Sequence, residues 1–527
     1  MRAVVTNLWS KLRVENGRVF SRVVVETTRP APWRVTASGR DRIAMRIDGG
    51  VALACGVVPV HDGLLEEVRV TAEQGAEVEL SLDHPAHHYL HDEEGVPHRI
   101  VVDIDRESLA HVLSGRRIVL APGHGGGHPG YSGPVNLLEK DVVLAIAADL
   151  GRLLSEAGAG VLYTRRTDSG VPWSQRVALA GAGDLYISLH AGAGRSGCAT
   201  GYPPGSPSSL ELARLVLEKL AVKTHLAGGG TYEAPHLADL GPVPAVEVQA
   251  VTITDWVEEG LLRSPTFRSK VAQGVFNGLV SYLWRRHGDA ARGKPAALIF
   301  GKRPPEANTL SGVIPVRTHL VTEGDDLFEL VERYTKDVAE PGDVVVLAES
   351  MVAITQGRAV PQQSVRPGPL ATFLSRFPAK DGSLATPHAM QLAIEEAGAP
   401  RVLLGAAAAA VGRPFGRRGD FYRVAGRHLA LIDDVAGTMW PYEKHIILGP
   451  RDPDRLAGQL KERLGVDVVV VDVNDIRCVD ILGASSGVDR RRVSRALLSN
   501  PLGNDDQQTP LAVIKGAAVI GRARPVW

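Results

Sequence analysis

The period of the hydrophobic pattern changes along the chain, and this change limits the folds that the chain can adopt. Between about residues 18 and 105, short runs such as "RVVVETT", "RIAMRID" and "AEVELSL" alternate apolar with polar residues, and Gly, Pro and Asp clusters separate the runs. Alternation with a period of two is typical of strands that are buried on one face. The pattern therefore predicts an antiparallel, all-β, sandwich-like domain over residues 1–113.

A different pattern fills the middle of the chain. Between residues 116 and 286, continuous apolar runs such as "RRIVLAP", "DLYISLH" and "PAVEVQAV" alternate with segments of helical periodicity. Strands of this kind are buried on both faces, which indicates a mostly parallel sheet covered by helices. We expect an α/β domain over residues 114–287. A linker is expected over residues 288–298, because "RRHGDAARGKP" is polar and contains Gly and Pro.

The last block, residues 299–527, predicts a second α/β or α+β domain. Its apolar runs, such as "GDVVVLAES" and "VDVVVVDVND", lie between helical segments. A chain of 527 residues is also too long for one ordinary hydrophobic core, so a multidomain protein is expected.

Composition and charge exclude several kinds of partner. The formal net charge is +0 and the sequence pI is about 7.3, so no overall field favours nucleic acid or an anionic membrane. The three cysteines, Cys55, Cys198 and Cys478, lie far apart and are expected to be free thiols. The first residues lack a continuous apolar segment, so no export signal is expected. No apolar run is long enough to span a bilayer.

A histidine follows one predicted strand, and a glutamate begins the helix after it. The apolar run at 118–122 ends at a proline, so His124 lies just beyond the carboxyl end of a strand, where open α/β sheets bind ligands. Asn136 is a favourable N-cap residue, which places Glu139 in the first turn of the next helix. The run "DLYISLH" brings His190 to the same edge of the sheet. Two histidines and one glutamate form a known ligand set for catalytic zinc with an open fourth position.

Several ordered motifs connect these residues to a known family. "APGHGG", "EKD", "TRRTD" and "SLHAG" follow one another, with an "SQRVALA" helix before the last of them. With these motifs, the chain resembles the zinc-dependent N-acetylmuramoyl-L-alanine amidases of the amidase-3 type over residues 116–286. The resemblance implies that His124, Glu139 and His190 bind zinc. It also implies that the metal activates water to attack the amide between the muramyl lactyl group and L-alanine of peptidoglycan or muropeptides.

The family also supplies a glutamate acid/base from its last strand, in a pattern like "PAVLVELGFLSN". Aligned without a gap, "PAVEVQAVTITD" has Gln249 at that position, and Glu247 stands two residues earlier on the same face of the strand. Glutamine cannot transfer a proton, so Glu247 is predicted to be the catalytic residue. Two alternatives remain open at this point: a strand shifted by two residues, or an impaired amidase in which Gln249 occupies the catalytic position.

The first and last blocks carry weaker resemblances. The first is similar to the AMIN domain, a strand-rich module that implies attachment to the cell wall. The last resembles the F420-0:γ-glutamyl ligase family in "TEGDDLFELVERYTKDVAEPGDVVVLAESMVAITQGR" and "NPLGNDDQQTPLAVIKG", which implies GTP and a cation such as Mg²⁺ or Mn²⁺. It departs from that family at Met351, where a lysine is usual, and it lacks the Asp-Glu-Ser-Asn signature. Asp472, Asp475 and Asp480 offer carboxylate oxygens to such a cation.

Two other features have simpler explanations. Histidines between His84 and His98 lie in a segment that is predicted to be a polar loop, where clustered histidines need no metal. Cys198 follows His190 in a Gly-rich segment, so a Cys–His nucleophile is a less favoured alternative to the metal.

Two functions therefore compete. The first is a peptidoglycan amidase, for which the resemblance implies a location in the cell envelope or outside the cell. The second is a cytoplasmic, GTP- and metal-dependent γ-glutamyl ligase-like protein whose amidase domain binds muropeptides or hydrolyses them weakly. The intact ligand set favours the first function, and the expected lack of an export signal favours the second.

Overall fold

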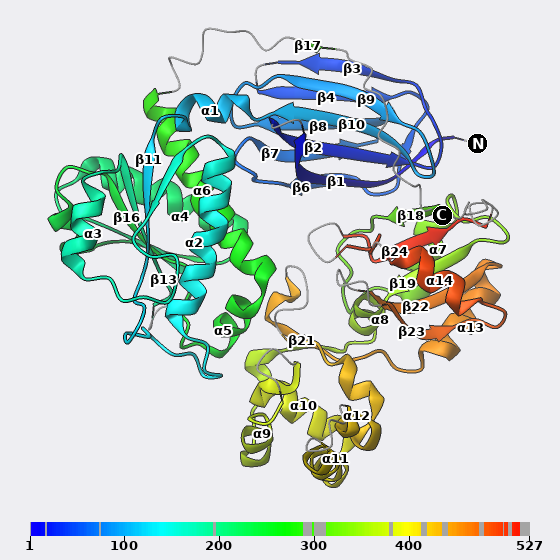
Figure 1. The fold of residues 1–527 in the computed structure, drawn as a ribbon. Coiled ribbons are helices and arrows are strands. Elements are labelled where there is room, and N and C mark those ends of the chain that lie inside the picture. Colours follow the sequence, from blue (N-terminus) through cyan, green and yellow to red (C-terminus); the bar gives the residue numbers. More distant parts are fainter. Residues whose placement is uncertain are drawn as a thin grey trace, which may run out of the picture.

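The computed structural model contains a β sandwich, two α/β domains and a small helical lobe (Figure 1). In Figure 1 the sandwich lies at the top, the central domain on the left, the carboxy-terminal domain on the right and the lobe below. The structure describes residues 2–15, 18–39, 41–72, 75–192, 196–287, 298–299, 312–378, 383–412, 419–434, 441–473, 479–498, 500–503 and 508–516.

Residues 4–105 form two stacked sheets. The first has the strand order β17-β9-β10-β2-β1-β5 and the second the order β3-β4-β8-β7-β6. Along β8 every second side chain is buried, as the period-two pattern predicts. The antiparallel pairing predicted for this block is confirmed in both sheets. The strands are β1 (Val4–Glu15), β2 (Arg18–Thr27), β3 (Trp33–Ser38), β4 (Arg42–Ile47), β5 (Val51–Ala52), β6 (Gly56–Pro59), β7 (Leu65–Thr71), β8 (Ala76–Leu82), β9 (His88–Glu93), β10 (His98–Asp105) and β17 (Leu298–Ile299).

The segment that follows the central domain returns to this sandwich. β17 pairs with β9 in parallel orientation at the edge of the first sheet. Residues 288–297, most of the predicted linker, lie outside the described residues.

The central domain is built on a six-stranded sheet with the order β12-β11-β13-β16-β14-β15. β12, β11, β13 and β16 are parallel, and β14 runs antiparallel to β16. Helices α2, α4 and α6 cover one face, while α3 and the short helix η1 cover the other. The mostly parallel sheet predicted here is confirmed. The elements are α1 (Glu107–Leu113), β11 (Arg117–Pro122), α2 (Glu139–Glu156), β12 (Gly160–Tyr163), α3 (Trp173–Ala180), β13 (Leu185–His190), β14 (Cys198–Tyr202), α4 (Pro207–Thr224), β15 (Gly228–Glu233), η1 (Pro235–Leu240), β16 (Ala245–Gln249), α5 (Trp256–Arg263) and α6 (Pro265–His287).

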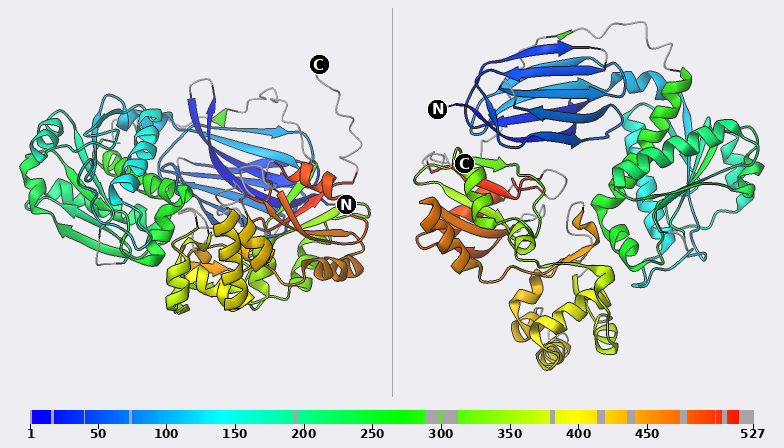
Figure 2. Two further views of the ribbon diagram at one scale, coloured as in Figure 1. Left: turned by 60° about the horizontal axis from the view of Figure 1, so that its bottom comes forward. Right: turned by 180° about the vertical axis from the view of Figure 1, so that it is seen from behind.

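Helix α4 connects the sandwich with the sheet of the central domain. Near its amino end, the Ser209 hydroxyl accepts a hydrogen bond from the N–H of Ala245 in β16, at 3.0 Å. Near its carboxyl end, Lys219 lies 2.7 Å from the Glu66 carboxylate, and Lys223 donates to the carbonyl oxygen of Val60 at 2.7 Å. One helix therefore contacts both the sandwich and a strand of the central sheet. Figure 2 shows the central domain beside the sandwich from two further directions.

A pair of carboxyl groups lies in this contact. Asp83 and Glu66 share Lys219, whose ammonium nitrogen lies 3.5 Å and 2.7 Å from them. Burial and the neighbouring charge of Glu66 raise the pKa of Asp83 to about 8. Burial also lowers the pKa of the neighbouring His84 to about 4, and its ring stacks on Trp284 of α6 at 4.3 Å.

The carboxy-terminal domain has a five-stranded mixed sheet with the order β18-β24-β19-β22-β23. Its backbone contacts the sandwich where the N–H of Arg317 donates to the carbonyl oxygen of Thr6 at 2.7 Å. The elements of the sheet layer are β18 (Val313–Val316), α7 (Leu327–Thr335), β19 (Val344–Ala348), α8 (Glu349–Thr355), α13 (Pro453–Leu464), β22 (Asp467–Val473), β23 (Val479–Ala484), α14 (Arg490–Leu497) and β24 (Leu511–Ile514).

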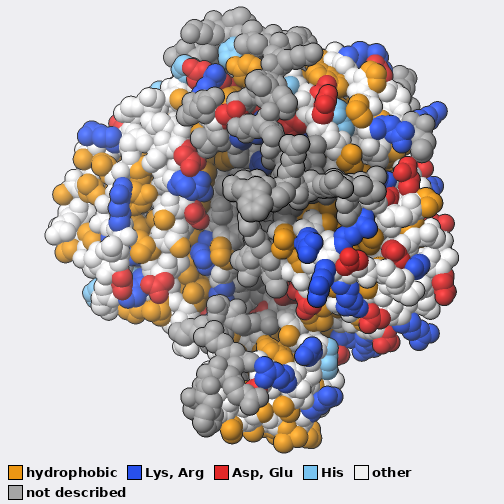
Figure 3. All heavy atoms as spheres, turned by 45° about the vertical axis from the view of Figure 1, so that its right-hand side comes forward, with side chains coloured by type: hydrophobic (Ala, Val, Ile, Leu, Met, Phe, Trp, Pro, Cys, Tyr) orange, Lys and Arg blue, Asp and Glu red, His pale blue; other side chains and the backbone are white. Residues whose placement is uncertain are grey.

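A helical lobe is inserted between β19 and β22 of this domain. Apolar side chains gather at its far end, at the bottom of Figure 3, and the exposed ones include Phe373, Leu404 and Val411. Among the described helices, none is long and apolar enough to cross a membrane. The lobe contains α9 (Pro369–Leu374), α10 (Pro387–Ala397), α11 (Ala399–Gly412) and α12 (Asp420–Ala425), and the two-stranded ribbon of β20 (Ala359–Pro361) and β21 (His445–Ile447) joins it to the sheet.

Candidate metal centre

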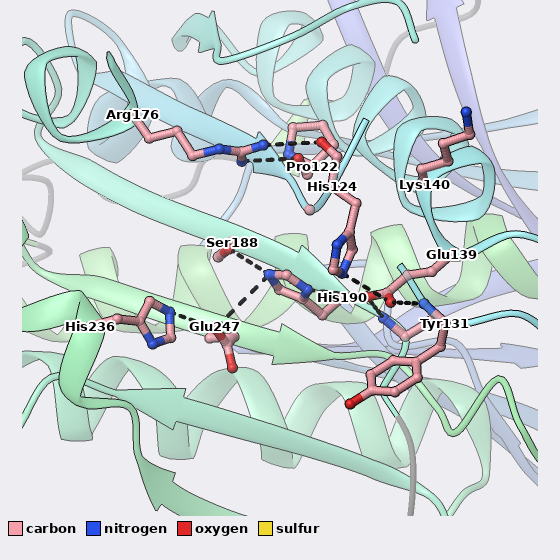
Figure 4. Close-up of polar contacts among 12 residues, drawn as sticks. Pro122, His124, Tyr131, Glu139, Lys140, Arg176, Ser188, His190, His236 and Glu247 are labelled. Carbon is pink, nitrogen blue, oxygen red and sulfur yellow. Dashed lines mark hydrogen bonds and ion pairs between the residues drawn. The ribbon is translucent and has the colours of Figure 1, made fainter. Parts of the chain in front are cut away.

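Two neighbouring parallel strands end at the same edge of the central sheet. β11 stops at Pro122, opposite Leu189 of β13, so His124 and His190 emerge side by side. Their ring centroids lie 5.4 Å apart, and the rings are nearly perpendicular at 87°. Figure 4 shows both rings beside the carboxylate of Glu139. The structure therefore brings the three predicted ligands together.

Two buried arginines hold the turn that carries His124. This residue has a φ of 56°, in the left-handed region that non-glycine residues seldom occupy. Arg176 donates to the carbonyl oxygens of Pro122 (3.0 Å) and His124 (3.2 Å), and Arg165 donates to that of Gly123 (2.7 Å). These bonds hold a strained backbone in place. Both arginines belong to motifs noticed in the sequence, but the sequence alone did not reveal this role.

Glu139 is the first residue of α2 and is only 1% exposed. Its Oε1 accepts a hydrogen bond from the N–H of Ala191 at 3.0 Å and lies 3.1 Å from His190 Nδ1. Its Oε2 accepts one from the N–H of Tyr131 at 3.0 Å and lies 3.0 Å from His124 Nε2. Burial by itself would raise the pKa of Glu139, but these hydrogen bonds hold it below its ordinary value.

The prediction that Asn136 caps α2 is wrong. The N-cap is Leu138, which makes no side-chain cap bond, and Asn136 lies in a turn with a φ of 63°. Fully buried Glu259 of α5 accepts the N–H groups of Val135 (2.8 Å) and Leu137 (3.1 Å) instead. The loop before α2 is therefore held by a distant residue, which no local pattern reveals.

The three predicted ligands fit a zinc ion. Within the described ranges, one group of His, Cys, Asp or Glu side chains has the geometry of a metal site. Its members are His124, Glu139 and His190, and their ligand atoms all lie within 4.8 Å of one another. A Cβ at Gly130 would lie 2.5 Å from Glu139 Oε2 and 2.6 Å from His124 Cδ2, so the loop closes over the cluster only with glycine there. Two imidazole nitrogens that face one buried carboxylate match the donor set of catalytic zinc.

β16 places Glu247 beside His190, but on the far side of the ring. Glu247 Oε2 lies 3.9 Å from His190 Nε2, and Ser188 Oγ lies 3.1 Å from the same nitrogen. Figure 4 shows that Nε2 points away from the other two predicted ligands. Gln249 pairs with His190 in the sheet, and its side chain packs against Gly192, where a Cβ would lie 2.6 Å from Gln249 Cδ. Glu247 is therefore the carboxylate that β16 supplies to this site.

Two further side chains contact Glu247. The hydroxyl of Tyr232 donates to Glu247 Oε1 at 2.7 Å, and His236 Nε2 lies 3.0 Å from Glu247 Oε2. Burial and the adjacent carboxylate raise the pKa of Tyr232, so its phenol stays protonated. No sequence motif marks either residue, because β15 and η1 meet β16 only in the folded domain.

The less favoured features do not form a second site. Burial raises the pKa of Cys198 to about 11, so its thiol stays protonated near neutral pH, which argues against a Cys–His nucleophile. The polar loop predicted around His84 to His98 is wrong in part. His88 begins β9, His98 begins β10, and both are buried in the sandwich. Cys478 lies outside the described residues.

The carboxy-terminal domain holds a separate group of acids. A cavity of about 450 Å³, bordered by this domain and by α5 and α6, is lined by Glu349, Asp433 and Asp472. Burial and the neighbouring carboxylates raise the pKa of Glu349 to about 9 and that of Asp433 to about 6. Asp480 faces Asp472 across β22 and β23, and Asp475 lies outside the described residues.

Two protein families match separate regions of the chain. Residues 118–281 match the N-acetylmuramoyl-L-alanine amidase family, and residues 315–479 match the F420-0:gamma-glutamyl ligase family. The second match lies in the domain that holds the acidic cavity.

The curated relatives match about a third of this chain. The N-acetylmuramoyl-L-alanine amidase AmiC of Neisseria meningitidis serogroup B is 30% identical, and the match covers 32% of this chain and 54% of that protein. The amidase LytC of Bacillus subtilis is 31% identical over 183 residues, covering 33% of this chain and 37% of that protein. The chain thus spans about half or less of these two relatives.

Solved structures of amidases also align with about a third of the chain. The amidase AmiC2 of Nostoc punctiforme is 27% identical and covers 33% of this chain and 99% of that one, with a TM-score of 0.31. An amidase of Clostridium difficile 630 is 26% identical and covers 32% and 96%, with a TM-score of 0.30. The family match and the curated relatives converge on one conclusion: over residues 118–281, this chain is similar to N-acetylmuramoyl-L-alanine amidases.

Proposed function

We propose that this protein is a zinc-dependent N-acetylmuramoyl-L-alanine amidase, which hydrolyses the amide between the muramyl lactyl group and L-alanine of peptidoglycan. The observation that carries the proposal is the convergence of His124, Glu139 and His190, whose ligand atoms lie within 4.8 Å of one another. The amidase family match over residues 118–281 includes all three.

These three residues would hold the metal. Zinc, when bound, acts as a Lewis acid that polarises the scissile carbonyl and activates water at neutral pH. The protein prepares the site by keeping Glu139 ionised, because the hydrogen bonds to its carboxylate lower its pKa. It also fixes the ring of His190, since Ser188 Oγ and Glu247 Oε2 approach its Nε2 at 3.1 and 3.9 Å. Such outer contacts orient metal-binding histidines.

Glu247 is the proposed proton acceptor. Its carboxylate lies between His190 and His236, at the same edge of the sheet as the metal ligands. An attacking water must lose a proton as its oxygen bonds to the carbonyl carbon, and a carboxylate is a suitable acceptor. The amide of Gln249 cannot accept it.

Metal analysis together with muropeptide hydrolysis tests this function. The purified chain is expected to contain about one zinc ion and to release L-alanine-containing peptides from soluble muropeptides or insoluble peptidoglycan. His190→Ala is expected to lose both zinc and hydrolysis. His128→Gln changes an exposed histidine of the nearby loop and is expected to keep both. A wild-type protein without zinc that leaves the amide intact would refute the proposal.

A second candidate function belongs to the carboxy-terminal domain. Its match to the F420-0:gamma-glutamyl ligase family and its acid-lined cavity favour a metal- and GTP-dependent ligation, with the amidase domain binding or weakly hydrolysing muropeptides. Binding of Mg²⁺ or Mn²⁺ and of GTP, measured by calorimetry on wild type and Asp472→Asn, tests it. If titration of the wild type with the cation or GTP gives no more heat than titration of buffer alone, this function is rejected. The amidase proposal is not affected by that result.

A further inference from the structure

The outer face of helix α11 in the lobe is apolar. The helix reads "APRVLLGAAAAAVG", with no charged residue after Arg401. One face packs closely on α12, since a Cβ at Gly405 would lie 2.8 Å from Ala425 Cβ. The other face is open to solvent, and Leu404 is 64% and Val411 68% exposed. A surface helix normally turns polar side chains to solvent, so this face is suited to contact with an apolar partner.

Other helices of the lobe also expose apolar side chains. Phe373 at the end of α9 and Phe377 just after it are 55% and 53% exposed, and their rings pack edge-to-face with centroids 5.2 Å apart. Val424 of α12 is 37% exposed. Figure 3 shows apolar side chains gathered at this end of the lobe. We call the exposed set the lobe face: Phe373, Phe377, Leu403, Leu404, Val411 and Val424.

Exposed arginines lie beside the apolar residues of the lobe face. Arg376 stands between the two phenylalanines, and Arg401 lies two residues before Leu403. Arg423 lies directly before the exposed valine of α12. Among the acids of the described lobe helices, only Glu395 is exposed. The chain is neutral overall, but the surface around the lobe face is therefore basic.

The basic surroundings distinguish between two kinds of apolar partner. In a symmetric dimer, both copies would present the same patch, so the arginines of one copy would approach those of the other without acids to compensate. An anionic lipid bilayer offers apolar acyl chains and negatively charged headgroups together. Arginine side chains can reach the headgroups while neighbouring apolar side chains enter the acyl region. The charge pattern therefore favours lipid over a second copy.

We propose that the lobe face docks on the surface of an anionic lipid bilayer, with the exposed side of α11 among the headgroups and the upper acyl chains. The contact is peripheral and uses side chains of three helices. In Figure 1 the lobe lies at the bottom of the molecule, and the loop from β11 to α2 lies at the bottom of the central domain. Lipid bound by the lobe is thus on the side of the molecule where the predicted metal ligands emerge.

Co-sedimentation of the full-length protein with vesicles tests the proposal. Vesicles of phosphatidylglycerol mixed with phosphatidylcholine are compared with vesicles of phosphatidylcholine alone. The wild type is expected to bind the anionic vesicles more tightly, with an affinity that falls as salt is added. Val411→Asp is expected to weaken this binding at least about tenfold, because it replaces an inserted apolar group by a charge. Val222→Asp is the matched control, since Val222 is an exposed valine near the carboxyl end of α4, and it should bind as wild type.

A second pair of variants tests the charge. Arg376→Gln is expected to weaken binding to anionic vesicles about fivefold, the effect of one basic side chain at a charged surface, with little change on neutral vesicles. Arg214→Gln removes an exposed arginine of α4 and is expected to bind as wild type. All four variants change exposed side chains, so their melting temperatures are expected to stay near that of wild type.

Three results would overturn lipid docking. The first is a wild type that stays in the supernatant with both kinds of vesicle, and the second is equal binding by Val411→Asp and Val222→Asp. The third comes from sedimentation velocity without lipid: a wild-type dimer that Val411→Asp dissociates would assign the lobe face to a second copy of the chain. These measurements involve neither zinc content nor muropeptide hydrolysis, so failure of lipid docking leaves the proposed amidase function standing.

Discussion

The buried glutamates Glu258 and Glu259 allow the link between the loop before α2 and the metal to be tested. They are adjacent in α5, both at most 1% exposed, and each accepts two backbone N–H groups. Glu259 holds Val135 and Leu137, in the loop that leads directly to Glu139, the predicted metal ligand. Glu258 holds Gly197 and Thr252, which belong to other loops. The pair therefore offers one substitution at two positions that differ in what they support.

Glu259→Gln is expected to weaken zinc binding. The carboxamide oxygen can accept one of the two N–H groups, but its NH₂ group faces the other, and a buried N–H without an acceptor costs about 1–3 kcal/mol. Where that cost falls on the folded loop before Glu139, each 1.4 kcal/mol weakens zinc affinity about tenfold. The expected loss is therefore about tenfold to a hundredfold. This range agrees with the usual effect of removing a group that supports a metal ligand.

Zinc affinity is measured by competition with a chromogenic chelator, and the melting temperature of the zinc-free protein is measured alongside. Glu258→Gln is the matched control, since it is expected to lower the melting temperature to a similar degree while keeping zinc affinity near wild type. The reasoning fails if Glu259→Gln and Glu258→Gln bind zinc equally well.

Three further outcomes are expected. Glu247→Gln should retain zinc and lose at least about a hundredfold in amide hydrolysis; a fully active Glu247→Gln combined with a strong gain in Gln249→Glu would assign the role to position 249. The folded protein raises the pKa of Asp83 to about 8, whereas an aspartate in the unfolded chain has a pKa of about 3.9. The protonated Asp83 therefore contributes fully to the free energy of unfolding below about pH 4, and this contribution is lost as the pH rises to about 8. Asp83→Asn should therefore flatten the melting temperature against pH in this window, and an unchanged slope would contradict the assignment. Residues 1–113 should co-sediment with insoluble peptidoglycan, and their recovery in the supernatant would rule out wall binding by the sandwich.

The parts of the site that the sequence predicted share one physical basis. A buried parallel strand must end at the edge of its sheet, so a histidine just after an apolar run has a determined place. His124 and His190 were predicted in this way, and the structure puts them beside Glu139. Side chains alternate between the two faces of a strand, so Glu247 and Gln249, two residues apart, were predicted to lie on one face of β16. The alternation could not predict that Gln249 packs against Gly192 while Glu247 approaches His190.

The parts that the sequence did not predict depend on contacts between distant segments. Asn136 has the side chain of a good helix cap, yet buried Glu259 takes over the loop and leaves Asn136 in a turn. His236 and Tyr232 have no motif, because their importance comes from reaching one carboxylate from different elements. The histidines near His88 were expected in a loop, because polar side chains at buried positions do not give the apolar–polar alternation of a strand. In β9 the side chains of His88 and Leu90 are nevertheless buried. Local preference is a weak guide wherever tertiary contacts decide.

Because α4 contacts the sandwich at one end and β16 at the other, it would couple ligand binding at the sandwich to metal binding at the central sheet. Lys219 and Lys223 fix one end to the sandwich, and Ser209 fixes the other to the first residue of β16, the strand that carries Glu247. A wall polymer that shifts the sandwich against this helix would change zinc affinity by some factor. Zinc must then change polymer affinity by the same factor, because the free energy of a closed binding cycle sums to zero.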